Sequence, residues 1–219
     1  ETTTLKRMSE VVREELGRVP LAVLSGPNIA SEIASRHPAS SVVASHDEAL
    51  ASEIQQAFTD GLFRLYTSSD VTGVELGGAL KNPIAIAAGI SDGLGFGANA
   101  KAALITRGVV EMARLGVALG AREQTFWGLS GLGDLVTTCL GGRNRWLGEQ
   151  IGQGRSLSAV LAGTPMVIEG VETTKAALAL GRRAQVELPI IEQVFRVLFR
   201  RTNPRTALRA LMVRARKAE

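Results

Sequence analysis

The pattern of apolar residues changes near residue 70, and this change limits what the chain can fold into. Before residue 70, short runs typical of strands alternate with runs of helical periodicity. Such alternation predicts βαβ units, with a mostly parallel sheet covered by helices. The predicted strands are residues 21–24 (short and buried), 41–44 and 63–66, and the predicted helices are residues 4–16, 29–35 and 47–58. Three strands make only a thin sheet, so this region looks like the latter end of a doubly wound α/β domain.

After residue 70 the signal is almost entirely helical. Asp70 belongs to a residue type that commonly caps a helix, and Pro189 stands where a proline can open one. We therefore expect an α/β part over residues 1–70 and an all-α part over residues 71–219. The predicted helices of the second part include residues 101–119, 146–151, 173–183, 190–200 and 208–216.

The composition is that of a globular protein. The 219 residues are 45% hydrophobic and 21% charged, which is enough apolar material for one large or two small cores. No apolar run approaches the ~18 residues that cross a bilayer, and no basic-then-apolar leader opens the chain. Cys139 is the lone cysteine, and His37 and His46 read as surface loop residues, so we expect no disulfide and no metal site. A reducing, cytoplasmic setting fits these features best.

Basic residues crowd the end of the chain, and the net charge is +4. One interpretation is a nucleic-acid footprint. The other is a solvated helix face with cations near its C-terminal end, where the helix dipole favours them. No aromatic stacking platform accompanies the charges, so we favour the solvated face and expect neither nucleic-acid binding nor membrane insertion. The basic residues are Arg196, Arg200, Arg201, Arg205, Arg209, Arg214, Arg216 and Lys217.

A dinucleotide-binding fold normally carries a G-x-G-x-x-G turn between its first strand and helix, and no such turn follows a predicted strand here. The nearest glycine cluster, Gly93–Gly97, follows a helical stretch and is interpreted as a connector between helices. The chain also starts at Glu1 without a methionine. We expect the phosphate-cradling part of the domain to lie upstream, so the 219 residues alone should bind dinucleotide poorly and be inactive.

Lys81 lies in a run that is otherwise nearly uncharged from Leu76 to Ile90. Desolvation disfavours a charged lysine in such surroundings unless it meets an anion, and burial makes a lysine suited to proton transfer. The alternative is a lysine whose stem covers the core while its ammonium reaches water, and spacing alone does not separate the two. Pro83 follows closely and predicts a kink if a helix continues through it.

Asp134 follows two glycines in the segment Gly131–Leu135. The glycines allow its carboxylate to approach a partner closely, so Asp134 could orient a lysine or accept a hydrogen bond from a substrate hydroxyl. The alternative is a helix N-cap aspartate, which satisfies free backbone amides. The segment on its own favours the cap slightly.

The segment Gly141–Arg145 leads into a predicted helix. Backbone amides at a helix start together with a planar guanidinium form a phosphate site, so we favour phosphate binding here over a simple glycine turn.

The segment Ser25–Asn28 follows a strand and precedes a helix. It therefore lies at the carboxyl edge of the sheet, where α/β folds bind ligands.

Taken together, these segments resemble the NAD(P)-dependent glycerol-3-phosphate dehydrogenases. The resemblance covers essentially the whole chain. It implies the last third of a Rossmann-type domain followed by an all-helical substrate domain, of the kind found at the C-terminus of 6-phosphogluconate dehydrogenase. The matching segments, in family order, are Leu24–Pro27, Gly78–Asn82, Gly95–Gly108, Gly131–Leu135, Gly142–Arg145 and Ile168–Thr174.

The resemblance also implies roles for single residues. Lys81 would accept the proton of the substrate hydroxyl, with Asp134 beside it. Gly142 stands where bacterial members often have serine, so it could contact ligand only through its backbone. Pro83 stands where an aliphatic residue is expected. The implied substrate-binding residues are Gly26, Asn28, Lys81, Asp134, Gly142, Arg143 and Asn144, and the implied cofactor contacts are Ala30, Arg143, Val167 and Glu169.

The implied reaction interconverts sn-glycerol 3-phosphate and dihydroxyacetone phosphate, with hydride transfer to or from NAD or NADP. It would supply glycerol 3-phosphate for phospholipid synthesis. The choice between the two cofactors is left open, as is the oligomeric state, for which a homodimer is the candidate. Two rival hypotheses remain. One is a β-hydroxyacid or ketopantoate-type dehydrogenase, which acts on carboxylates, and the other is a non-catalytic helical module that binds an acidic partner through the basic end.

Overall fold

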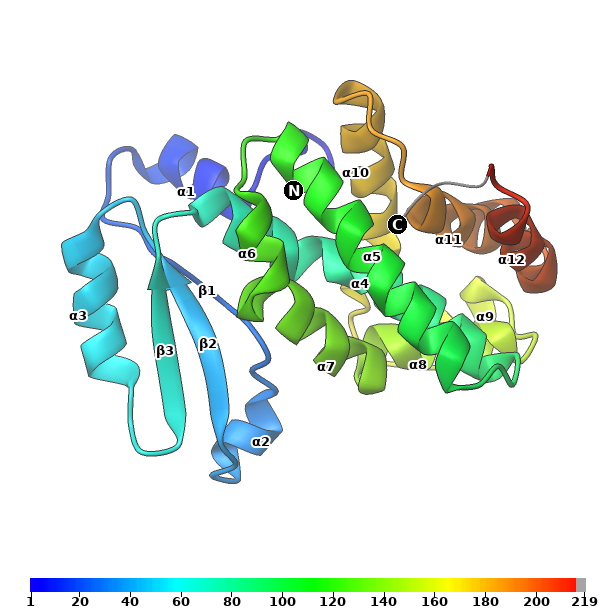
Figure 1. The fold of residues 1–219 in the computed structure, drawn as a ribbon, viewed down its shortest axis with the longest axis horizontal. Helices are drawn as coiled ribbons and strands as arrows, with labels where there is room; N and C mark the ends of the chain where they lie inside the picture. The colour runs from blue at the N-terminus through cyan, green and yellow to red at the C-terminus, as the bar shows by residue number, and fades with distance from the viewer. Residues whose placement is uncertain (216–219) are drawn as a thin grey trace.

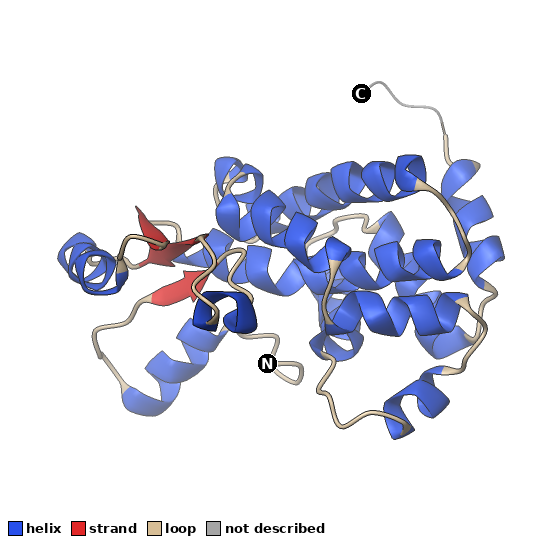
Figure 2. Ribbon diagram, turned by 90° about the horizontal axis from the view of Figure 1, so that it is seen from below, coloured by secondary structure: helices blue, strands red, loops and turns tan. Residues whose placement is uncertain are grey.

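The computed structural model describes residues 1–215. A small sheet with three helices forms one end of the molecule, and a larger bundle of helices forms the rest (Figure 1; Figure 2). The elements of the first part are α1 (Met8–Leu16), β1 (Val23–Ser25), α2 (Ala30–Ala34), β2 (Ala39–Ala44), α3 (Glu48–Phe58) and β3 (Phe63–Ser68). Those of the second are α4 (Val71–Gly93), α5 (Ala98–Ala118), α6 (Glu123–Trp127), the π-helix η1 (Leu129–Gly133), α7 (Asp134–Leu140), α8 (Arg143–Gly152), α9 (Leu157–Ala162), α10 (Glu169–Arg183), α11 (Pro189–Arg200) and α12 (Pro204–Met212).

The sheet has the order β1-β2-β3, and its two strand pairs differ in direction. β2 and β3 are parallel, because α3 connects them as a crossover helix that packs on both strands. β1 is antiparallel to β2, so the prediction of a mostly parallel sheet is wrong for this strand. The connection from β1 to β2, residues 26–38, contains only the five-residue helix α2, which lies beyond the end of the sheet rather than across its face (Figure 1).

Burial also differs between the strands. Val43 and Leu65 are buried, as predicted for strands 41–44 and 63–66. Leu24 in β1 is 46% exposed, so the prediction that this strand is buried is wrong. β1 pairs with β2 on one edge, and within residues 1–215 no strand pairs with its other edge.

Several helix starts differ from the prediction for local reasons. α1 begins at Met8 rather than at residue 4, because residues 2–4 form a turn and Leu5 has φ +62°, which interrupts a right-handed helix. α12 begins at Pro204 rather than at 208, with Asn203 as its cap, and ends at Met212, while Arg216 lies outside the described residues. α8 and α10 begin three and four residues earlier than predicted. The glycine cluster between α4 and α5 is a connector, as predicted.

α4 is the central element of the bundle. It is buried along most of its 23 residues and continues through Pro83 without a break in the helix. It contacts α5, α7, α8, α10 and α11. Glycines permit the closest crossing, that of α4 on α8: a Cβ on Gly89 would lie 1.9 Å from the carbonyl oxygen of Arg145. The helix that carries Lys81 is therefore held on several sides.

Asp70 joins the two parts of the chain. It is the N-cap of α4, as predicted, and its Oδ1 accepts a hydrogen bond from the amide of Gly73 at 2.9 Å. Its Oδ2 accepts from the amide of Arg122 at 2.9 Å and from the hydroxyl of Thr125 at 2.6 Å. One buried carboxylate thus ties the start of α4 to α6. The division into residues 1–70 and 71–219 stays a prediction.

Across residues 1–215, no helix is both long and apolar enough to pass through a membrane. In the same residues, no group of three or more His, Cys, Asp or Glu side chains could hold a metal ion. His37 and His46 are exposed. Three of the terminal arginines have partners: Arg196 pairs with Glu192, Arg214 pairs with Glu187, and Arg205 lies over the ring of Phe96.

Candidate active site

Lys81 and Asp134 meet although 53 positions separate them in sequence. Lys81 lies in the middle of α4, and Asp134 is the first residue of α7. The Lys81 Nζ lies 2.5 Å from the Asp134 Oδ2, and the two side chains are 18% and 7% exposed. Asp134 makes no capping hydrogen bond, because Gly133 holds the N-cap position of α7. Of the two interpretations of Asp134, the lysine partner is therefore confirmed and the helix cap is wrong.

Burial raises the pKa of the Asp134 carboxyl above its ordinary value. The Lys81 ammonium opposes this shift through its charge and its hydrogen bond, and so does Thr138, whose hydroxyl donates to the Asp134 Oδ1 at 3.3 Å. The pair is thus a partly buried ion pair in which each charge compensates the desolvation of the other. Such a pair can exchange a proton with a third group.

Small residues bring Asp134 to α4. A Cβ on Gly77 would lie 2.5 Å from the Ser130 carbonyl oxygen, and a Cβ on Gly131 would lie 2.2 Å from the Phe126 carbonyl oxygen. The π-helix η1 can therefore press directly on the backbone of α4, and α7 begins at its end. π-helical turns are rare and often lie at functional sites.

A cavity of about 620 Å³ opens beside the Lys81–Asp134 pair. Gly26 and Asn28 line it together with Lys81 and Asp134, so the structure brings four of the predicted substrate residues to one place. Gly26 has φ +144°, and a Cβ there would lie 2.9 Å from the Cα of Ser41. Only glycine fits this turn, which carries the segment after β1 to the wall of the cavity. The predicted ligand edge of the sheet thus faces the lysine.

Asn144 lies next to the same region. It is 4% exposed, its Nδ2 donates to the Asn82 Oδ1 at 3.0 Å, and its Oδ1 accepts from the amide of Gly170 at 2.9 Å. Asn82 directly follows Lys81 in the chain. The start of α8 is therefore tied to the turn of α4 that carries the lysine.

Arg143 and Gly142 lie outside the lining of this cavity. The Arg143 side chain is half exposed and pairs with Glu169, with 2.6 Å between its Nη2 and the Glu169 Oε1. Gly142 has φ +92° and precedes α8. The structure thus joins the ammonium and the carboxylate directly. The Arg143 guanidinium instead pairs with Glu169, and it is the next residue in the chain, Asn144, that contacts Asn82 beside Lys81.

The predicted cofactor residues lie in two places. Arg143 and Glu169 form the ion pair just described, and Val167, two residues before Glu169, is 71% exposed. Ala30 is exposed at the start of α2, in the other part of the molecule. All four positions are exposed.

Three polar residues of this region, Asn82, Thr138 and Glu75, had no role in the sequence interpretation. Asn82 accepts the hydrogen bond of Asn144, and Thr138 donates to Asp134. Both had a signal in the sequence: Asn82 closes the segment Gly78–Asn82, and Thr138 stands four residues after Asp134, which is one helical turn. Glu75, which also lines the cavity, had no such signal in the sequence.

Comparison with known proteins identifies the family. The model of the C-terminus of NAD-dependent glycerol-3-phosphate dehydrogenase matches residues 70–209, and the model of the N-terminus matches residues 1–51. The glycerol-3-phosphate dehydrogenase [NAD(P)+] of Syntrophotalea carbinolica is 55% identical over all of this chain, which covers 67% of that protein. The enzyme of the same name from Geobacillus kaustophilus is 51% identical, again over all of this chain, with 65% of its own length covered.

Solved structures agree with this assignment. The crystal structure of glycerol-3-phosphate dehydrogenase from Coxiella burnetii has a TM-score of 0.93 and 41% identity, and the match covers 97% of this chain and 66% of that one. A glycerol-3-phosphate dehydrogenase structure from Plasmodium falciparum has a TM-score of 0.87 and 25% identity, with 97% and 62% covered. The chain thus spans about two thirds of the length of its relatives. The expected fold, a Rossmann-type part followed by a helical domain, is confirmed. This chain belongs to the NAD(P)-dependent glycerol-3-phosphate dehydrogenase family.

Proposed function

We propose that the chain carries the catalytic and substrate-binding part of an enzyme that interconverts sn-glycerol 3-phosphate and dihydroxyacetone phosphate. The observation that carries the proposal is the Lys81–Asp134 pair, 2.5 Å apart at the edge of a cavity. Curated relatives that are 50–55% identical over the whole chain bear the name of this enzyme. The product of the reductive direction, glycerol 3-phosphate, serves phospholipid synthesis.

Lys81 is the proposed proton-transfer group. In the oxidative direction its uncharged amine takes the proton of the substrate C2 hydroxyl while a hydride leaves the same carbon. In the reductive direction its ammonium gives a proton to the developing alkoxide. Asp134 orients the Lys81 Nζ and compensates its charge. NAD or NADP, when bound, supplies or accepts the hydride.

The residues of this chain fit the reactive end of such a cofactor. The Gly26 turn at the carboxyl end of β1 lines the same cavity as Lys81, and that is where α/β folds place a nucleotide's reactive part. We propose Ala30, Arg143, Val167 and Glu169 as cofactor contacts on the resemblance to the family, and the exposure of all four leaves them accessible to a ligand. The G-x-G-x-x-G turn that cradles a pyrophosphate is not in the sequence.

Arg143, Asn144 and Gly142 are the proposed phosphate site. Asn144 is buried and tied to Asn82, so it is held in place, whereas Arg143 is half exposed and bound only to Glu169 in the contacts described above. The guanidinium can offer a planar pair of donors to a phosphate at the start of α8. A phosphate held there, remote from C2, orients the reacting carbon against Lys81.

Substrate preference tests the proposal. A polypeptide of the relatives' full length, with this chain as its C-terminal two thirds, is assayed with NADH and with NADPH. We expect turnover of dihydroxyacetone phosphate and little or none of β-hydroxyacid or ketopantoate-type substrates. A preference for unphosphorylated keto acids would instead indicate a β-hydroxyacid or ketopantoate-type dehydrogenase. Absence of any turnover would favour the non-catalytic module, which leaves the buried Lys81–Asp134 pair without a purpose.

We further propose that the protein is a cytoplasmic homodimer. The lone Cys139 is buried, and burial raises its pKa to about 12, so a reducing compartment is compatible with this thiol but not required by it.

The proposed dimer has an apolar surface available. Val117 and Trp127, on α5 and α6, are 48% and 45% exposed and offer apolar surface to a second copy. Sedimentation at micromolar concentration measures the oligomeric state, and a monomer mass would refute the dimer.

A further inference from the structure

The segment before α1 forms one wall of the Lys81 cavity. Leu5, Lys6 and Arg7 line it together with Met8, the first residue of α1, and the lining also includes Thr173 and Leu180 of α10. The segment is not part of a strand, and its backbone leaves the right-handed region at Leu5, with φ +62°. Something other than regular secondary structure must therefore hold this wall in place.

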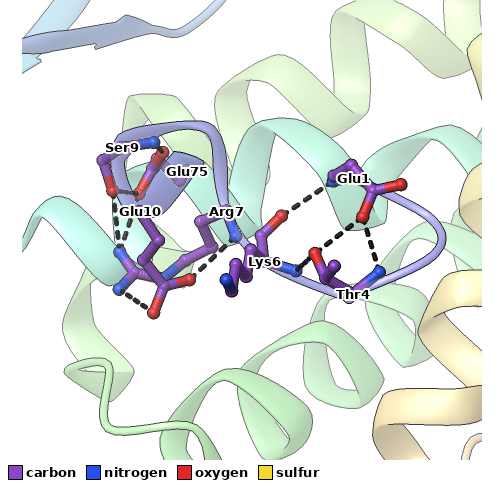
Figure 3. A network of polar contacts seen from close by, with 7 residues as sticks. All are labelled: Glu1, Thr4, Lys6, Arg7, Ser9, Glu10 and Glu75. Carbon is purple, nitrogen blue, oxygen red and sulfur yellow. Dashed lines mark hydrogen bonds and ion pairs between the residues drawn. The ribbon is translucent and has the colours of Figure 1, made fainter. Parts of the chain in front are cut away.

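A carboxylate of α4, Glu75, ties the segment to the helix that carries Lys81. Figure 3 shows the side chains of Arg7, Ser9 and Glu75 turned toward one another. The Glu75 Oε1 accepts the backbone amide of Ser9 at 2.8 Å, and its Oε2 accepts the Ser9 hydroxyl at 2.6 Å and the Arg7 Nη1 at 2.7 Å. Both oxygens are thus in use, and three donors from the N-terminal segment converge on one side chain.

The chemistry of α1 explains why a carboxylate is needed. Ser9 is the second residue of α1, so its amide is one of the donors that have no partner within the helix. A negative charge at this end also interacts favourably with the helix dipole. The Glu75 side chain is only 10% exposed, so its hydrogen bonds to Arg7 and Ser9 are largely shielded from water. Charge-assisted hydrogen bonds of this kind are stronger than neutral ones.

The position of Glu75 connects this anchor to the catalytic lysine. Glu75 and Lys81 are six residues apart on α4, a rise of about 9 Å along the helix. Both residues line the same cavity, as do Gly78 and Ala79 between them. α4 is packed on several sides by other helices. The N-terminal wall is therefore attached to α4, the same helix that carries Lys81.

We propose that Glu75 is a positioning residue, which holds the segment from Leu5 to Ser9 as a wall of the substrate cavity at a set distance from Lys81. The inference rests on the proposed function, because it assigns the cavity to substrate. Arg7 belongs to the anchor of this wall, since its guanidinium contacts Glu75, Ser9 and Glu10. A loosened wall leaves the Lys81–Asp134 pair intact and weakens the binding of substrate.

Glu75→Gln tests the proposal, since it keeps the shape of the side chain and removes its charge. In the full-length enzyme we expect the KM for dihydroxyacetone phosphate to rise on the order of tenfold, with kcat per active site changed by less than about twofold. Arg7→Met, which keeps the aliphatic stem, should raise the KM by a smaller factor in the same direction. Hydrogen exchange of the peptide covering residues 1–9, measured without substrate, should be faster in both variants.

Glu10→Gln is the matched control. Glu10 also pairs with Arg7, and it accepts the Arg7 amide at 2.8 Å, but it lies within α1 and makes no bond to α4. We expect its KM to equal that of the parent, even if α1 is less stable.

Three results would overturn the proposal. The first is an unchanged KM in Glu75→Gln together with a lower Tm or fewer active sites, which is the signature of a merely structural role. The second is an equal rise of KM in Glu10→Gln. The third is an unchanged exchange of residues 1–9 in Glu75→Gln. No turnover by the parent would refute the proposed function and the role of Glu75 with it, whereas turnover with an unchanged KM in Glu75→Gln refutes the role of Glu75 alone.

Discussion

The Lys81 ammonium has one charged partner in the cavity, the Asp134 carboxylate, and the two are close enough to share a proton. An isolated buried charge would be strongly unfavourable, and the pair removes that difficulty for both groups. A substrate hydroxyl that approaches the Lys81 Nζ therefore meets a nitrogen whose direction is already set. Orientation of this kind is what proton transfer to or from carbon-bound oxygen requires.

Lys81→Ala should abolish turnover while the fold is retained. The variant lacks the only proposed proton-transfer group, and general acid–base catalysis contributes on the order of 10²–10⁴-fold. Steady-state kinetics and circular dichroism of the full-length enzyme measure the two effects. Lys175→Ala is the control, because Lys175 is an exposed lysine paired with Glu172, outside the cavity lining. Near-normal turnover in Lys81→Ala would remove Lys81 from the mechanism.

Arg143→Ala should chiefly weaken the binding of the phosphorylated substrate. Loss of a charged donor pair corresponds to about 10–100-fold in KM for dihydroxyacetone phosphate, and dihydroxyacetone itself should be affected much less. Arg196→Ala is a closely matched control, since Arg196 is as exposed as Arg143 and has a glutamate partner at 2.7 Å. Equal KM values for the phosphorylated substrate in parent and Arg143→Ala would contradict the phosphate site.

At the scale of elements, helix ends account for most of the difference between prediction and structure. The strands at 41–44 and 63–66 and most helices exist where apolar periodicity places them. The start of α1 was missed because Leu5 adopts a left-handed conformation that its residue type does not announce. The start of α12 could have been found, since Asn203 followed by Pro204 is a common N-terminal signal of a helix.

α11 has an N-terminal cap that comes from another helix. Glu111 of α5 is 3% exposed, and its two oxygens accept the amides of Ile190 and Ile191 at 2.9 Å each. Burial raises the pKa of the Glu111 carboxyl to about 7, although both amides and nearby arginines lower it. The packing of α11 on α5 is therefore linked to the protonation state of one side chain.

This linkage predicts a pH dependence of stability. The Glu111 carboxyl releases its proton near pH 4.5 when unfolded and near 7 when folded. Between these values the native state binds more protons, so the contribution of Glu111 to the free energy of unfolding falls as pH rises, by up to about 3 kcal/mol. Urea unfolding at a series of pH values from 4.5 to 7.5 measures this change in the free energy of unfolding.

The control for this prediction is the difference between parent and variant. Glu111→Gln lacks the titrating group, so the free energy of unfolding of the parent minus that of Glu111→Gln should decrease with pH in this window and level off above it. Glu192→Gln, an exposed change on the first turn of α11, should leave the slope of the parent unaltered. A difference that does not vary with pH would show that Glu111 ionises normally.

At the scale of the whole molecule, the chain presents a bundle of helices that contains the Lys81–Asp134 pair and a sheet of three strands. The second edge of β1 is unpaired within residues 1–215, and Leu24 is exposed. The sequence has no pyrophosphate-binding turn, and the relatives are half as long again. The proposed substrate-binding residues therefore lie within these 219 residues, whereas a pyrophosphate-binding turn does not.

We accordingly expect the 219 residues by themselves to show no turnover and to bind NADH weakly. The cavity and the Lys81–Asp134 pair remain in the isolated chain, but without the pyrophosphate contacts the cofactor is not held. Fluorescence titration with NADH and a dihydroxyacetone phosphate assay measure both properties, with the full-length enzyme as control. Appreciable activity of the isolated chain would overturn this expectation.

The sequence by itself determined the order of an α/β part and a helical part, most elements, and the segments around Lys81, Asp134 and Arg143, because periodicity and motifs are local properties. Only the tertiary structure decided that Lys81 meets Asp134, that Arg143 pairs with Glu169, and that Glu75 holds Arg7 and Ser9. It also decided the direction of β1 and the burial of Glu111. Each of these depends on contacts between residues far apart in the chain, and nothing in their local sequence encodes the partner.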